Sequence, residues 1–213
     1  MPAHVLEKQY VDLAHQSETA ELGIWAFIAT EVLFLGGLFA AYSFYRYLHP
    51  QGVAEAASHT KIIIGAVNTA VLLTSSFFMS WASLAAREGS SRLAGRVMWP
   101  AVGLGLVFII LKGVEYAEEI GEHLWPGPGF SLDTVEPQVG EVFYFIYWLL
   151  TGIHALHLLV GITAVAVIAW RAGQGAYSRA YHIPVRIVSL YWHFVDIVWI
   201  FLFALIYLPG RGA

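Results

Sequence analysis

The chain has 213 residues, of which 58% are hydrophobic and 12% charged, and its mean hydropathy is +0.65. Soluble domains carry about 25% charged residues, so this composition excludes an ordinary soluble domain and indicates a membrane protein. The chain has no cysteine and a formal net charge of −4, which excludes disulfides and thiolate metal sites and argues against nucleic acid as a partner.

Five apolar stretches are long enough to cross a bilayer, which requires about 20 mostly apolar residues in a helix. Their limits are set by length and by polar connectors, because helices buried in lipid and protein are apolar on all sides. The sequence therefore predicts an all-α, polytopic membrane protein: one membrane domain over 1–213, a bundle of five transmembrane helices, with a polar N-terminal segment at 1–22. The predicted helices are about 23–47, 62–86, 97–119, 141–170 and 186–208.

Two prolines help to place the helix boundaries. Pro100 and Pro184 are expected at or near helix starts, where a missing N–H costs least. The fourth stretch is longer than a bilayer requires, so it is expected to tilt or to project beyond the membrane.

The basic residues of the connectors predict the orientation in the membrane. One side would carry seven of them and the other side three, and the side richer in Lys and Arg faces the cytoplasm. We therefore expect a cytoplasmic N-terminus and a periplasmic C-terminus. The two sets are Lys8, Arg87, Arg92, Arg96, Arg171, Arg179 and Arg186 against Arg46, Lys61 and Arg211.

The third connector, 118–138, contains no Lys or Arg and is acidic. One interpretation is that outer connectors simply lack positive charge. The alternative is a docking face for a basic partner such as a c-type cytochrome. The acidic residues are Glu118, Glu119, Glu122, Asp133 and Glu136.

Four ionisable residues in three of the predicted helices lie at comparable depth. With a rise of about 1.5 Å per residue, Glu31 lies roughly 12 Å from the inner surface, His193 roughly 10 Å, Asp196 roughly 15 Å and His157 roughly 20 Å. His193 and Asp196 also share a helix face, because they are three residues apart. The four are therefore expected to form one buried hydrogen-bonded group.

Two compatible roles follow for this group. It could be a polar clasp that fixes helix register, as polar side chains often do in membranes. It could also be a proton site, because a carboxylate in apolar surroundings tends to hold a proton. No catalytic residue is predicted.

The other polar groups inside the spans are interpreted as structural. Lys112 and Glu115 are three apart near the outer end of the third helix and are expected to pair, with the lysine snorkelling outward. Asn68 and His154 are expected to make helix contacts or interhelical hydrogen bonds.

A metal site is the competing chemistry. His154 and His157 lie on adjacent turns, and together with His193 and a carboxylate from Glu31 or Asp196 they could bind zinc or non-haem iron. The Glu-x-x-His pair of di-iron bundles is missing, however. We therefore predict no metal site, and a stand-alone membrane metalloenzyme remains an alternative.

Five stretches, in order along the chain, resemble subunit III of the haem–copper terminal oxidases. Each stretch by itself would be weak evidence of a relationship, but together the five span nearly the whole chain. They are Phe27-Ile-Ala-Thr-Glu-Val-Leu-Phe34, Asn68-Thr-Ala-Val-Leu-Leu-Thr-Ser-Ser76, Lys112-Gly-Val-Glu-Tyr116, Thr151-Gly-Ile-His-Ala-Leu-His-Leu-Leu-Val-Gly161 and Tyr191-Trp-His-Phe-Val-Asp-Ile-Val-Trp199.

The resemblance implies a non-catalytic subunit of a cytochrome c or quinol oxidase in a bacterial cytoplasmic membrane. In that family the haems and copper are in partner subunits, and subunit III packs beside subunit I, binds phospholipid and supports proton uptake during O₂ reduction. Subunits II and IV are further expected neighbours. Glu31 matches the family carboxylate that is implicated in proton supply and reacts with carbodiimide.

The chain departs from the seven-helix members of that family, because only 22 residues precede the helix of Glu31. Lipid sites on the two missing helices cannot be transferred to it. A five-helix relative also accompanies bacterial nitric oxide reductases, so an accessory subunit of that enzyme is the alternative function. A proton-coupled transporter is disfavoured, because the chain has no inverted repeat and no pair of broken helices.

Overall fold

The computed structural model describes residues 10–133 and 136–211, which are almost entirely helical. Five of the helical segments are long and apolar enough to cross a membrane, which confirms the prediction of an all-α protein with five spans. In chain order the elements are α1 (Leu13–Leu48), α2 (Pro50–Ser58), α3 (Ile62–Arg87), α4 (Ser91–Gly121), α5 (Pro137–Gly173), α6 (Ile183–Leu202) and the π-helical turn η1 (Phe203–Tyr207), which continues α6.

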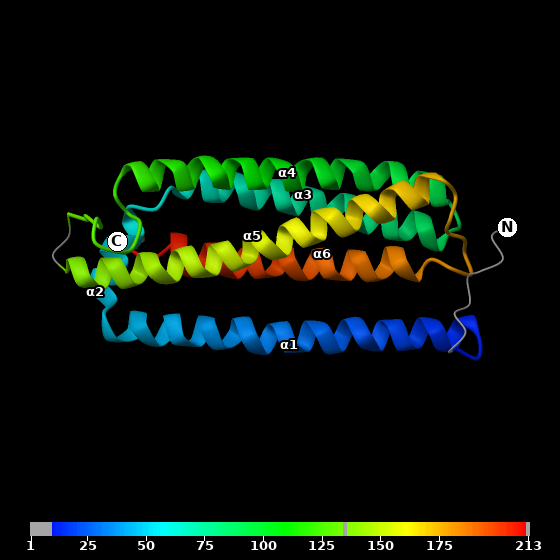
Figure 1. Ribbon diagram of the computed structural model, residues 1–213, viewed down its shortest axis with the longest axis horizontal. Helices are drawn as coiled ribbons and strands as arrows, with labels where there is room; N and C mark the ends of the chain where they lie inside the picture. Colours follow the sequence, from blue (N-terminus) through cyan, green and yellow to red (C-terminus); the bar gives the residue numbers. More distant parts are fainter. Residues whose placement is uncertain (1–9, 134–135, 212–213) are drawn as a thin grey trace.

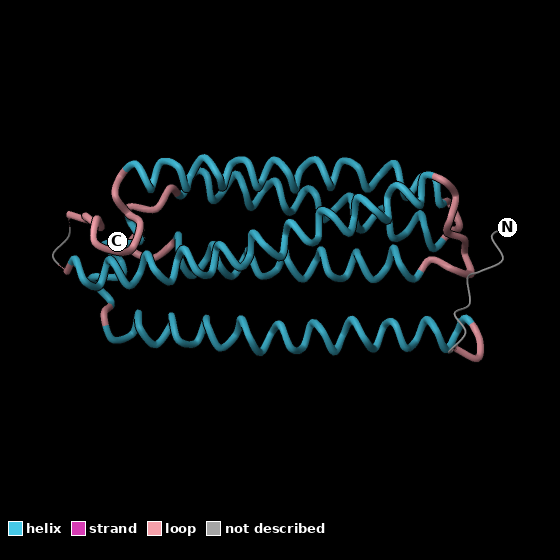
Figure 2. Tube along the Cα trace, in the orientation of Figure 1, coloured by secondary structure: helices cyan, strands magenta, loops and turns pink. Residues whose placement is uncertain are grey.

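Helices α3, α4, α5 and α6 pack together as a four-helix core (Figure 1). Helix α1 lies along the outside of this core and contacts mainly α6. The connectors gather at the two ends of the bundle (Figure 2). We call the end that holds α2 and η1 the C-terminal end, and the end that holds the start of α1 the N-terminal end.

Small residues allow the core helices to approach closely. A Cβ atom on Gly95 of α4 would lie 2.6 Å from the backbone nitrogen of Gly173, and one on Gly105 would lie 2.9 Å from side-chain atoms of Ile162 and Trp192. In contrast, the glycines of α1 (Gly23, Gly36 and Gly37) have no such neighbour within 4 Å. The interior of the described part of the molecule therefore lies between α3, α4, α5 and α6.

The described chain ends by docking against α2. The guanidinium of Arg211 donates a hydrogen bond to the carbonyl oxygen of Ser58 at 2.7 Å and another to that of Thr60. Gly210 has a φ of 77° and approaches the backbone of Ala54 so closely that a side chain would collide with it. These contacts cover carbonyl groups that the end of α2 leaves without helical partners.

Several boundaries differ from the predicted ones. Helix α1 begins at Leu13, where Asp12 caps it by accepting a hydrogen bond from the backbone of His15, so much of the segment predicted as polar and separate is helical. Pro100 lies inside α4 rather than at its start, which membrane helices tolerate when neighbouring groups satisfy the freed carbonyl. Pro184 does lie at the start of α6, as predicted, whereas the short helix α2 was not predicted.

Candidate functional site

Glu31 of α1 and His157 of α5 form a partly buried pair. Their Oε2 and Nε2 atoms are 3.2 Å apart, and the two side chains are 19% and 20% exposed. The other ring nitrogen, Nδ1, lies 2.9 Å from the carbonyl oxygen of Ile153. A carbonyl can only accept, so Nδ1 must carry a hydrogen.

This tautomer determines what the pair can do. With a hydrogen on Nδ1, a neutral imidazole has a bare Nε2 that can only accept a hydrogen bond. The bond to Glu31 therefore requires one more proton, either on the carboxyl group or on the ring. Glu31 and His157 are thus close enough to share one proton across α1 and α5.

His193 does not join this pair, which corrects the expected four-residue group. Its Nδ1 atom is 2.6 Å from the Ser76 hydroxyl, and its Nε2 atom is 3.3 Å from the hydroxyls of Ser80 and Ser189. The ring therefore links α6 to α3 and not to α1 or α5. Comparable depth suggested contact, but depth does not determine the direction in which a side chain points around its helix.

Asp196 also lies apart from Glu31. It is 3% exposed, and neither carboxyl oxygen has a hydrogen-bond partner among the described residues, although the Ser76 hydroxyl that bonds to His193 is close by. The indole N–H groups of Trp192 and Trp199, on the same side of α6, donate to Ser75 and Thr69 of α3. This face of α6 therefore packs against α3.

His154 and Asn68 are inside the four-helix core. His154 is 2% exposed and is held between the rings of Phe108 and Trp199, with centroid distances of 5.5 and 5.1 Å. Neither its ring nitrogens nor the side-chain amide of Asn68 makes a hydrogen bond with another described residue. Within residues 10–133 and 136–211, no three His, Asp or Glu side chains are placed to bind one metal ion together.

A second polar group, which we call the Lys112 cluster, consists of Lys112, Glu115, Glu119, Tyr147 and Tyr207. Lys112 and Glu115 pair at 3.0 Å, as the sequence predicted. The predicted snorkelling is wrong, because Lys112 is 2% exposed and donates to the hydroxyls of both tyrosines at 2.7 Å. The cluster joins α4, α5 and η1 near the C-terminal end of the bundle.

The sequence reasoning missed three members of this cluster. Glu119 has the spacing that places it on the same face of α4 as Lys112 and Glu115, so this face could have been found from the helical period. Tyr147 and Tyr207 carry no such signal, because buried tyrosines are common in an aromatic membrane protein.

The third connector is less acidic on its surface than its sequence suggested. Glu119 is buried, and Glu122 pairs with Lys61 at 2.5 Å, with Glu118 4.0 Å from the same lysine. The hydrogen bond that Lys61 donates to Glu122 raises the pKa of the lysine, so it stays charged and offsets part of the acidic surface. Glu136 lies 3.9 Å from His49, outside this group.

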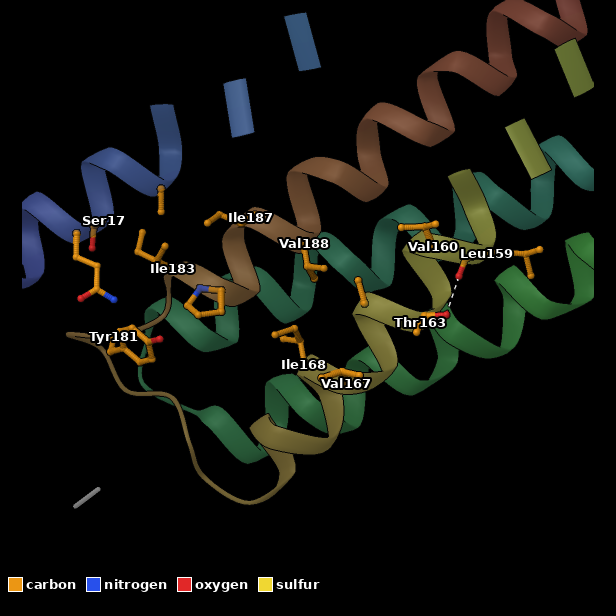
Figure 3. Close-up of a pocket in the computed structure, with 14 residues that line it drawn as sticks. Ser17, Leu159, Val160, Thr163, Val167, Ile168, Tyr181, Ile183, Ile187 and Val188 are labelled. Carbon is orange, nitrogen blue, oxygen red and sulfur yellow. Dashed lines mark hydrogen bonds between the residues drawn. The ribbon is translucent and has the colours of Figure 1, made fainter. Parts of the chain in front are cut away.

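Two apolar cavities flank α1. The larger, about 840 Å³, lies near the N-terminal end between α1, α5, α6 and the connector that carries Tyr181 (Figure 3). Its wall is mostly aliphatic, with Gln16, Ser17, Thr163 and Tyr181 as polar groups. The smaller, about 470 Å³, lies between α1 and α6 and contains the edge of His193.

Comparison with known proteins relates nearly the whole chain to one protein family. The profile of the family described as cytochrome c oxidase subunit III matches residues 12–211. A cytochrome c oxidase subunit 3 from Thermostichus vulcanus is 32% identical over 203 residues, which is 94% of this chain and 93% of the relative. A subunit 3 from Synechocystis is 34% identical over 87% of this chain and 74% of its own, and one from Corynebacterium diphtheriae is 29% identical over 93% and 92%.

Proposed function

The chain belongs to the cytochrome c oxidase subunit III family, and we propose that it supports O₂ reduction by a haem–copper oxidase without carrying a cofactor itself. The observation that carries this proposal is the partly exposed Glu31–His157 pair, because it would give the subunit a proton-holding site between α1 and α5. The haems and copper would be in the partner subunits. The names of the relatives favour an oxidase over the accessory subunit of a nitric oxide reductase.

The proposed role of the pair is to supply protons to the catalytic subunit. The proton between Glu31 and His157 can reside on either partner, so the pair can accept and release it with little movement of the helices. Partial exposure leaves it reachable from outside the four-helix core. His193 and Asp196 would act as polar contacts of α6 with α3 rather than as members of this site.

Phospholipid is the proposed occupant of the larger cavity. Its volume and its aliphatic wall suit acyl chains, and each buried CH₂ group contributes about 0.8 kcal/mol. Ser17 and Tyr181 could bond to a polar headgroup. Arg186, which pairs with Glu21 at 2.6 Å and is 44% exposed, lies at the same end of the bundle.

The proposed setting is a bacterial cytoplasmic membrane, with the N-terminus cytoplasmic and the C-terminus periplasmic. Subunit I is the main proposed partner, and subunits II and IV are further candidates. A cytochrome c near the third connector is a weaker proposal than the sequence suggested, because Lys61 partly neutralises Glu118 and Glu122.

Gentle purification from native membranes through a tag on this chain tests the assignment. We expect haem absorption in the visible spectrum, O₂ consumption and bound phospholipid to accompany the chain. Nitric oxide consumption in place of O₂ consumption would support the alternative, and purification without a haem protein would contradict both.

A matched pair of variants tests the lipid site. Val167→Trp fills the larger cavity, whereas Ile110→Trp adds the same ring to an exposed position of α4 that lies outside the cavity. We expect fewer retained phospholipids per complex with the first variant only. Equal retention in both variants would contradict the proposed site.

A further inference from the structure

The Lys112 cluster contains one more carboxyl group than its lysine can balance. An ammonium group has three N–H donors, and those of Lys112 reach Glu115 at 3.0 Å and Tyr147 and Tyr207 at 2.7 Å each. Tyr207 in turn donates to Glu115 at 2.8 Å. Lys112 and Glu115 are therefore a satisfied, neutral ion pair.

Glu119 is the carboxyl group that this ion pair does not balance. It is 1% exposed, its Oε1 atom is 2.6 Å from the Tyr147 hydroxyl, and its Oε2 atom has no hydrogen-bond partner among the described residues. An ionised Glu119 would give a buried group of net charge −1 with one oxygen unsatisfied. Such a charge costs several kcal/mol in apolar surroundings.

A protonated Glu119 satisfies every donor in the cluster. Its O–H can donate to the Tyr147 oxygen at 2.6 Å, and the Tyr147 proton can then go to Oε1 of Glu115 at 3.1 Å. Glu119 then leaves only one neutral carbonyl oxygen, Oε2, without a hydrogen-bond donor among the described residues. Burying a neutral oxygen in this way costs much less free energy than burying an unpaired charge. An ionised Glu119 would also pair every donor, but it would leave a buried net charge with one bare oxygen. The charge balance of the cluster therefore favours the neutral acid.

We propose that Glu119 is a second proton-binding site of this protein, which exchanges its proton with water at the C-terminal end of the bundle. It lies two residues, about 3 Å along the helix axis, from Gly121 at the end of α4. Beyond it are the exposed carboxylates of Glu118 and Glu122 and the ammonium of Lys61. These three groups provide both proton acceptors and a donor at the surface.

The site is separate from Glu31 and His157, which pair across α1 and α5. The ionisable groups that act on Glu119 come from every element around it. They are Lys112, Glu115 and Tyr116 of α4, Tyr144 and Tyr147 of α5, Tyr207 of η1, and Lys61 before α3.

Infrared spectroscopy of the purified, intact complex tests the proposal. We expect a protonated-carboxyl C=O band that is present at neutral pH, is lost in Glu119→Gln, shifts in D₂O and weakens at alkaline pH. Glu118→Gln, the adjacent but half-exposed carboxylate, is the control and should leave this band unchanged. An unchanged spectrum in Glu119→Gln would mean that Glu119 is ionised, and a band that neither exchanges nor titrates would mean a static group; both would overturn the proposal.

Thermal stability gives a second readout that does not depend on the band. A folded state that keeps a proton which the unfolded chain releases loses stability as pH rises. Glu119→Gln should therefore match wild type at acidic pH and unfold at a higher temperature at neutral and alkaline pH. A Glu119→Gln variant that is less stable than wild type at neutral pH would contradict a neutral Glu119. If this variant fails to assemble, Tyr147→Phe, which removes the hydroxyl bonded to Glu119, should shift the same infrared band.

Discussion

Helices α1 and α4 are similar in composition but differ in how much of their surface packs against the rest of the bundle. Both are long and apolar, and both contain glycines and a carboxylate in the span. Yet α4 packs against α3 and α5, with Gly95 and Gly105 in close contact with neighbouring helices, whereas only Leu35 and Tyr42 of α1 are buried. The difference indicates that α4 holds the bundle together, whereas most of the surface of α1 is left outside it.

The polar groups of the two helices follow the same division. Glu31 of α1 makes one bond to His157, and the two side chains remain 19% and 20% exposed. Lys112 of α4 makes three bonds in an interior that is closed to solvent. Removing one partner should thus affect stability strongly in the Lys112 cluster and weakly in the Glu31–His157 pair.

The largest expected effect is from Lys112→Met. This change leaves the Glu115 carboxylate buried without its cation, and breaking a buried pair in this way costs about 3–5 kcal/mol. Thermal or denaturant unfolding in detergent measures the loss. Lys61→Met, at the exposed end of α3, is the control and should have little effect; equal losses in both variants would refute the distinction between interior and surface.

Close packing is tested next by Gly95→Ala. The added methyl group would meet the backbone of Gly173 and Ala169, and overpacking of this kind costs about 1–3 kcal/mol. Gly37→Ala in α1 adds the same methyl group where nothing lies within 4 Å, so it should be neutral or stabilise by up to about 1 kcal/mol. If Gly37→Ala were the more harmful of the two in unfolding measurements, α1 would be packed more tightly than the structure indicates.

A smaller effect on stability is expected from Glu31→Gln. One hydrogen bond is altered in a partly exposed pair, and the cost should be about 1 kcal/mol or less. The unfolding midpoint of the assembled subunit measures it. A loss as large as that of Lys112→Met would mean that Glu31 is a main structural clasp.

The smallest effect is expected at the surface pair of Lys61 and Glu122, whose side chains are 29% and 48% exposed. Lys61→Gln should cost a few tenths of a kcal/mol. Because the pKa of Lys61 is raised in the folded protein, the pair contributes fully at neutral pH, and its contribution is lost only as pH rises through that raised value. Comparison of unfolding midpoints at neutral and strongly alkaline pH checks this sign; a contribution that grew with pH would contradict it.

Much of the fold was predictable because hydrocarbon thickness sets helix length. Five spans, the start of α6 at Pro184 and the pairing of Lys112 with Glu115 all follow from spacing and composition. The missed features depend on three-dimensional neighbours. Membrane helices are apolar all round, so nothing in α6 alone reveals that His193 points to the serines of α3.

The burial of Lys112 illustrates the same limit. Near a helix end, a lysine can extend toward water, and local spacing favours that conformation. The acceptors that keep it inside, Tyr147 and Tyr207, come from α5 and η1, far away in sequence. Whether such a lysine is buried or extends toward water depends on tertiary contacts that a single sequence does not display.

The central claim is that Glu31 serves proton supply rather than stability, and prolonged turnover measures this most directly. Purified complexes with Glu31→Gln should assemble normally but lose O₂-reduction activity sooner than wild type or show an altered pH dependence, most visibly at high pH. Glu18→Gln, an exposed carboxylate on the same helix, should behave as wild type. If Glu31→Gln turned over indistinguishably from wild type through prolonged catalysis at high pH, the proton role would be refuted and only the helix contact with His157 would remain.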